Sequence, residues 1–95
     1  MPLFLCFKVE SVRVDWTLDL DLGQYQYRLC GFIYYGSNHF TSRIITNTGD
    51  IWYNDGMQNG RIYSHEDHWH NFTSTQIHRA PQNRQLIIGL YVRTQ

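Results

Sequence analysis

Short turn-forming segments separate the long apolar runs of this 95-residue chain. Residues 36–38 (GSN), 47–50 (NTGD) and 54–56 (NDG) are rich in the residues that reverse a chain. Strands joined by so few residues pair antiparallel, because a parallel pair needs a crossover of about a dozen residues or more. The sequence therefore predicts a mainly β fold, an antiparallel sheet meander of about six strands.

The apolar residues fix where those strands are expected. Residues 3–9 are almost continuously apolar and are predicted to form a buried strand. Residues 12–22 alternate apolar and polar side chains, which indicates a strand with one face in water. Further strands are expected at residues 25–35, 39–46, 51–53 and 86–92.

One stretch does not fit the strand pattern. Residues 64–83 are polar and contain four of the five histidines and Pro81. They are expected to form a loop with at most one irregular helical turn, so that residues 65–84 are a polar insertion in a single partial domain spanning residues 1–95. The alternative for this stretch is a small metal site built on His65, His68 and His70. That spacing matches no zinc template and no cysteine lies nearby, so no metal and no cofactor are predicted.

Composition excludes several classes of function. The formal net charge is zero and the arginines are scattered, so neither a nucleic-acid partner nor a membrane surface is expected. No apolar run reaches the ~20 residues that span a bilayer. Cys6 and Cys30 lie inside apolar runs and fit no metal or redox motif. Reduced thiols and the lack of a signal peptide predict a cytoplasmic or nuclear protein.

A histidine and an Asn-Asp pair form the most informative constellation. His39 begins one predicted strand, and Asn54 and Asp55 close the next. A hairpin between those strands would return the pair toward His39. An acceptor oxygen could then hold one ring nitrogen and leave the other facing a nucleophile. Spacing alone is also compatible with an ordinary hydrogen-bonded surface histidine.

The surrounding residues resemble a known catalytic motif. The segment from Tyr27 to Arg43 reads YxLxGxIYxGxxHFTxR, and Trp52-Tyr53-Asn54-Asp55 follows it. This pattern, within residues 27–57, resembles the histidine box of the ubiquitin-specific proteases, which are papain-like cysteine peptidases. The strands at residues 2–7, 12–22 and 86–93 also resemble strands of that family. The resemblance implies the antiparallel sheet, or palm, of the papain-like fold.

The resemblance assigns roles to individual residues. His39 would be the general base, and Asn54 would orient it, with Asp55 as the alternative because the segment after Trp52 is shorter than usual. Asn38 and Phe40 flank His39 and would line the channel for the substrate tail. The family commonly has glycine at the position of Asn38, so the asparagine side chain would narrow that channel.

The family's cysteine box is not found in this sequence, and neither Cys6 nor Cys30 is placed at a helix start where a thiolate is stabilised. The chain is therefore expected to be inactive alone and to hydrolyse isopeptide bonds when joined to a lobe that carries the cysteine. Its expected partner is ubiquitin or a ubiquitin-like protein. The alternative is an inactive ubiquitin-binding or structural module. An exposed apolar sheet face is also expected, through which the chain would self-associate or bind a partner lobe.

Overall fold

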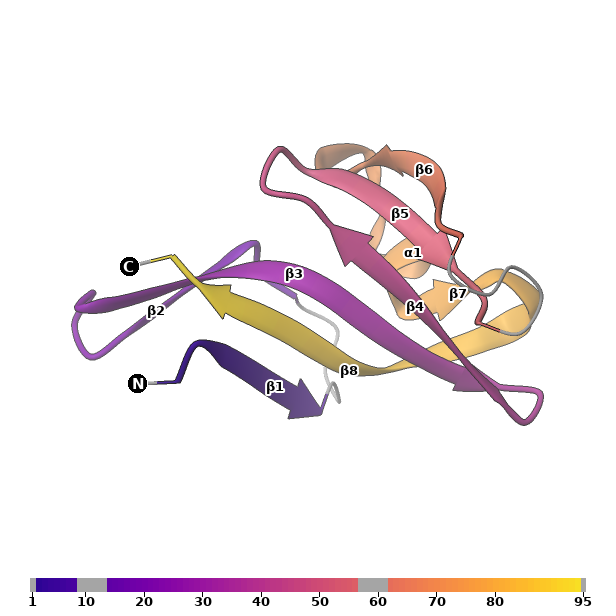
Figure 1. Cartoon of the computed structure of the whole chain (residues 1–95), viewed down its shortest axis with the longest axis horizontal. Coiled ribbons are helices and arrows are strands. Elements are labelled where there is room, and N and C mark those ends of the chain that lie inside the picture. The colour runs from indigo at the N-terminus through magenta and orange to yellow at the C-terminus, as the bar shows by residue number, and fades with distance from the viewer. Residues whose placement is uncertain (1, 9–13, 57–61, 95) are drawn as a thin grey trace.

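The computed structural model describes residues 2–8, 14–56 and 62–94. Within them the chain is mainly β, with one eight-stranded antiparallel sheet and little helix (Figure 1). The strands are β1 (Phe4–Lys8), β2 (Thr17–Leu20), β3 (Tyr25–Gly36), β4 (His39–Ile45), β5 (Asp50–Asn54), β6 (Ser64–His68), β7 (Arg79–Ala80) and β8 (Arg84–Arg93). The helical segments are η1 (Trp69–Asn71), α1 (Ser74–His78) and η2 (Pro81–Asn83).

The strand order is not a simple meander. It runs β1-β8-β3-β4-β5-β6, with β2 paired to β3 and β7 paired to β8. The predicted meander is correct from β3 to β5, and β6 extends it at a segment that was not predicted to be a strand. β8 returns from the end of the chain to lie between β1 and β3 (Figure 1). Isoleucine and leucine side chains on both faces of β8 suit this central position.

Two strand predictions need correction. Residues 3–9 were expected to be buried, but β1 is an edge strand whose side chains alternate between exposed and half-buried, and Val9 lies outside the described residues. Residues 12–22 were expected to form one long strand, but β2 covers only Thr17–Leu20. Asp21 and Leu22 adopt positive φ angles and turn the chain into β3 instead, and residues 12–13 lie outside the described part.

The predicted turn at residues 36–38 is confirmed. Ser37 and Asn38 have φ angles of 52° and 61° and join β3 to β4 as a two-residue hairpin. Such a pair of left-handed residues matches the twist of the flanking strands, and asparagine tolerates this conformation better than most residues. The tight turn brings His39 directly opposite Gly36.

The prediction for residues 64–83 is correct only in part. The expected helical turn is present as α1, whose N-terminus is held by reciprocal hydrogen bonds between Thr73 and Gln76, but the segment also contains β6, which pairs with β5. Polar side chains suit β6 because it is an edge strand in contact with water. Among the described residues no helix is long and apolar enough to cross a membrane.

The segment from β6 to β7 covers one face of the sheet, called here the inner face. Phe32 of β3 stacks on Trp69, with ring centroids 6.3 Å apart. Tyr34 of β3 donates a hydrogen bond to the carbonyl of Ile77 over 2.6 Å. Ile77 itself is buried in the core. The segment from β6 to β7 therefore covers the hydrophobic core and is not a free loop.

A buried arginine fastens this cover to the sheet. Arg43 on β4 is only 5% exposed, and its Nε donates to Glu66 Oε1 on β6 over 2.7 Å. Its Nη2 donates to the second carboxylate oxygen over 3.1 Å, so the pair is bidentate. Its Nη1 donates to the carbonyl of Gln76 over 2.6 Å and to the hydroxyl of Tyr34 over 2.9 Å. One guanidinium thus links β3, β4, β6 and α1.

The electrostatics of this cluster follow from burial. Desolvation by itself lowers the pKa of Arg43, but the hydrogen bonds and charges of Glu66 and Tyr34 together outweigh it, and the pKa is raised. Burial also raises the pKa of Tyr34 to about 12, against the opposing effect of Arg43. Tyr34 therefore stays a neutral donor to Ile77 under ordinary conditions.

Replacing Glu66 should destabilise the fold. Glu66→Ala leaves the Arg43 guanidinium without its carboxylate, and we expect a loss of about 2–3 kcal/mol, below the largest losses for buried pairs because Glu66 is partly exposed. Glu66→Gln keeps an acceptor oxygen and should cost about 1 kcal/mol. Urea unfolding followed by tryptophan fluorescence measures both. A Glu66→Ala variant as stable as the natural chain would contradict the role of this pair.

Stability should also fall in strong base. Because the pKa of Tyr34 is raised from 10.0 to about 12 in the fold, its contribution is complete below pH 10 and is lost as the pH rises toward 12. The shift corresponds to roughly 2–3 kcal/mol. Urea unfolding at pH 9 and at pH 11.5 should show a steeper decline for the natural chain than for Tyr34→Phe. Parallel declines would rule Tyr34 out as the cause.

Candidate functional site

His39 lies half-buried at the start of β4, just after the tight turn. Its Nε2 is 2.7 Å from the backbone carbonyl oxygen of Asp55, which follows the end of β5. A carbonyl oxygen only accepts hydrogen bonds, so Nε2 must carry the proton. Nδ1 then keeps its lone pair and has no hydrogen-bond partner among the described residues. In this tautomer Nδ1 can act only as a hydrogen-bond acceptor.

The register of β4 and β5 explains why Asp55, not Asn54, meets the histidine. Ser42 pairs with Asn54, so these two side chains share one face of the sheet. His39 lies three residues before Ser42 and therefore belongs to the opposite face. The Asn54 side-chain amide donates instead to the carbonyl of Ile62 over 2.7 Å. Of the two predicted orienting residues, the structure brings Asp55 to His39, and it does so through the main chain.

The two predicted channel residues flank His39. Asn38 is exposed in the turn. Phe40 is 59% exposed, and its ring packs on Tyr35 with centroids 4.6 Å apart. Successive side chains of a strand point to opposite faces, so Phe40 faces away from the side of the sheet that carries His39. Asn38 belongs to the turn, where strand alternation does not fix the direction of its side chain.

Sequence reasoning missed Arg84, which lies across Gly36 from His39. A Cβ atom on Gly36 would stand 3.0 Å from the Arg84 Cα and 3.1 Å from its Cγ, so a larger residue would require Arg84 to shift by a few tenths of an ångström. Arg84 is 4% exposed, and its Nη1 donates to the carbonyl of Pro81 over 3.1 Å. Its Nε has no hydrogen-bond partner. No local signal reveals this contact, because it arises from the distant pairing of β3 with β8.

Neither cysteine is near His39. Cys30 lies six residues before Gly36 on β3, and six residues of strand span about 20 Å. Cys6 on β1 pairs with Leu90, which pairs with Gly31, so it lies toward the same end of the sheet as Cys30. Burial raises the pKa of the Cys30 thiol, which favours the unreactive protonated form. The described residues therefore place no thiol within reach of the imidazole.

The histidines of β6 and η1 have structural partners. His65 packs edge-on against Trp52 and lies 3.3 Å from an Asp50 carboxylate oxygen. The Nε2 of His68 lies 2.6 Å from the carbonyl oxygen of Thr48, which holds the turn between β4 and β5. Across residues 2–8, 14–56 and 62–94, no three histidine, cysteine or acidic side chains gather as a metal site would require.

The chain was compared with protein-family models, curated proteins and solved structures. No family model, curated protein or solved structure matches this chain. The chemical meaning of the site therefore depends on its geometry and on the resemblance of its motif.

The tautomer of His39 can be measured directly. We expect the neutral ring to carry its proton on Nε2, because the Asp55 carbonyl requires a donor. Long-range proton–nitrogen correlation spectra distinguish the two tautomers by the nitrogen shifts. Asp55→Ala retains the main-chain carbonyl and should leave the tautomer unchanged. A proton on Nδ1 in the natural chain would contradict the site described here.

Proposed function

We propose that this chain is the histidine-bearing sheet of a cysteine peptidase similar to the ubiquitin-specific proteases. The observation that carries the proposal is the hydrogen bond from His39 Nε2 to the Asp55 carbonyl oxygen. This hydrogen bond orients the ring and leaves Nδ1 as the base. Orienting the histidine in this way is the function of the third member of a catalytic triad. Here a main-chain oxygen provides the contact that the resemblance expected from a side chain of Asn54 or Asp55.

In the proposed reaction the nucleophile is a cysteine thiol on an adjoining helical lobe. His39 Nδ1 takes the thiol proton, and the thiolate attacks the carbonyl carbon of the isopeptide bond. The C–N bond breaks, and the imidazolium returns the proton to the leaving lysine amine. Water then hydrolyses the thioester with His39 again as base. The carboxylate product and the cysteine thiol complete the cycle.

The substrate of this proposal is ubiquitin or a ubiquitin-like protein joined to a lysine. Asn38 would border the channel, and its exposed position in the turn leaves room for an extended peptide. Phe40 would contact the substrate only from the other face of β4. Such chemistry needs a reduced thiol, which fits a cytoplasmic or nuclear location.

A second candidate function is an inactive module that keeps the sheet and binds ubiquitin or another protein without covalent chemistry. The separation of about 20 Å between Cys30 and the Gly36–His39 turn supports it for the chain by itself, because it leaves His39 without a thiol to activate. Both candidates predict the same behaviour for the isolated chain. They differ when a lobe with a reactive cysteine is joined to it.

An electrophilic ubiquitin probe tests the isolated chain. Such a probe labels a thiolate that an active site has activated. We expect no adduct on Cys6 or Cys30, measured by intact-mass spectrometry, because His39 can activate neither. A denatured sample treated with a small alkylating reagent provides the control that both thiols are reduced. Labelling of either cysteine by the probe would overturn the assignment of the nucleophile to another lobe.

Substitution of His39 tests the proposed base in a protein that joins this sheet to a cysteine lobe. His39→Ala should reduce kcat by about 10²–10⁴-fold or more while the fold is retained. Asp55→Ala keeps the carbonyl that holds the imidazole and should cost far less. Turnover of a fluorogenic ubiquitin substrate and the circular dichroism spectrum give the two readouts. Full activity of His39→Ala would contradict the assignment of His39 as the base.

A further inference from the structure

Large apolar side chains gather on the face of the sheet opposite the inner one. Five of them are between 36% and 59% exposed and are called here the outer apolar face: Ile33, Tyr35, Phe40, Ile44 and Trp52. The register places them side by side, since Tyr35 pairs with Phe40 and Ile44 pairs with Trp52. Patches of this kind on soluble proteins usually mark an interaction site.

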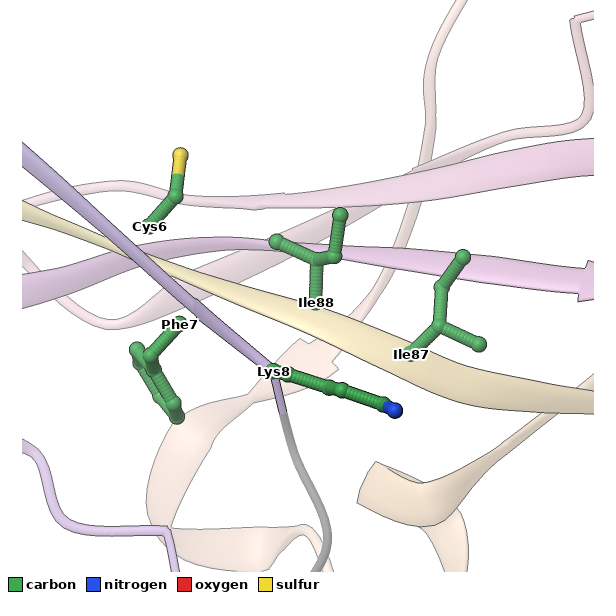
Figure 2. A pocket seen from close by; sticks show the side chains of 5 residues that line it. All are labelled: Cys6, Phe7, Lys8, Ile87 and Ile88. Carbon is green, nitrogen blue, oxygen red and sulfur yellow. The ribbon is translucent and has the colours of Figure 1, made fainter.

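The face that carries these side chains also contains a pocket, near β1 and β8. A pocket of about 360 Å³ is lined by Cys6, Phe7, Lys8, Ile87 and Ile88. Figure 2 shows the side chains of Cys6, Ile87 and Ile88 projecting to the same side of the ribbons. Ile88 pairs with Ile33, so the pocket is continuous with the outer apolar face. The volume exceeds the ~150 Å³ that accommodates a benzene ring in a protein cavity.

Phe40 cannot fill this pocket in its own chain. Ile88 pairs with Ile33 and Ile33 with Ser42, so the pocket lies two strands from β4, about 10 Å away. Phe40 lies a further two residues along β4, about 7 Å. The Phe40 ring and the pocket therefore lie on the same face of the chain but too far apart to meet. A two-fold axis between them would seat each ring in the pocket of a second copy.

We propose that two copies of this chain dimerise through their outer apolar faces, with Phe40 of each copy in the Ile87–Ile88 pocket of the other. At ~200 Å² per large side chain, the exposed parts of the five residues present roughly 400 Å² per copy. Two copies bury about twice that area, and the pocket linings bring it near the ~1,000 Å² that a specific interface should reach.

Charge favours a second copy as the occupant. The chain has eight basic and eight acidic residues and no net charge, so two copies approach without net repulsion. Among the residues that form the outer apolar face and line the pocket, Lys8 alone is charged. The interface lies on the face of β4 opposite His39, so its test is independent of the proposed enzyme function.

Sedimentation velocity tests the dimer from about 1 µM to about 100 µM, a range suited to micromolar affinity. The natural chain should shift from monomer to dimer over this range. Phe40→Lys and Ile44→Lys should remain monomeric, because each places an ammonium group in the apolar contact. Leu22→Lys is the matched control, since Leu22 is fully exposed in the turn before β3, and it should behave as the natural chain does.

Alkylation of Cys6 locates the contact without a substitution that could unfold the chain. The rate should fall as the natural chain is concentrated, because the partner's ring covers the pocket, and should not depend on concentration for Phe40→Lys. A natural chain that stays monomeric throughout would overturn the proposal, as would a dimer whose Cys6 remains equally reactive. Protection of Cys6 only by an added cysteine lobe would assign the face to that lobe instead.

Discussion

The bidentate pair between Arg43 and Glu66 joins the two parts from which this fold is built. The β3–β4–β5 hairpins supply the sheet, and the segment from β6 to α1 supplies the cover of its inner face. The Arg43 guanidinium spans both, because Glu66, Gln76 and Tyr34 all accept its hydrogen bonds. A buried charge of this kind is tolerated only when its partners are in place. The cover must therefore dock in one position, and the polar segment acquires regular structure.

The candidate site depends on the opposite end of the same hairpin. The turn at Ser37 and Asn38 starts β4 at His39, and the β4–β5 register ends β5 at Asn54. These two local choices put the Asp55 carbonyl at the imidazole. Arg43 lies four residues further along β4, on the same face as His39. One strand therefore carries both the candidate base and the residue that fixes the cover of the core.

Local sequence patterns predicted the features that local interactions determine. The hairpin at residues 36–38 was predictable because turn chemistry is encoded in adjacent residues. The position of β8 in the sheet was not predictable, because its pairing with β1 and β3 joins opposite ends of the chain. Residues 64–83 lack apolar periodicity, and the partner that orders them, Arg43, is distant in sequence. The alternation of Thr41, Arg43 and Ile45 did contain a signal, since it puts the arginine on the buried face.

The same distinction applies to the site. His39 and the return of the chain toward it were predictable, whereas the choice between Asn54 and Asp55 needed the strand register. The central claim is that His39 Nδ1 serves a thiol from another lobe. The most direct measurement is a crystal structure of this sheet joined to the cysteine lobe. We predict the cysteine sulfur within hydrogen-bond reach of His39 Nδ1, with Nε2 still on the Asp55 carbonyl. A sulfur remote from this ring, or one that faces Nε2, would contradict the account.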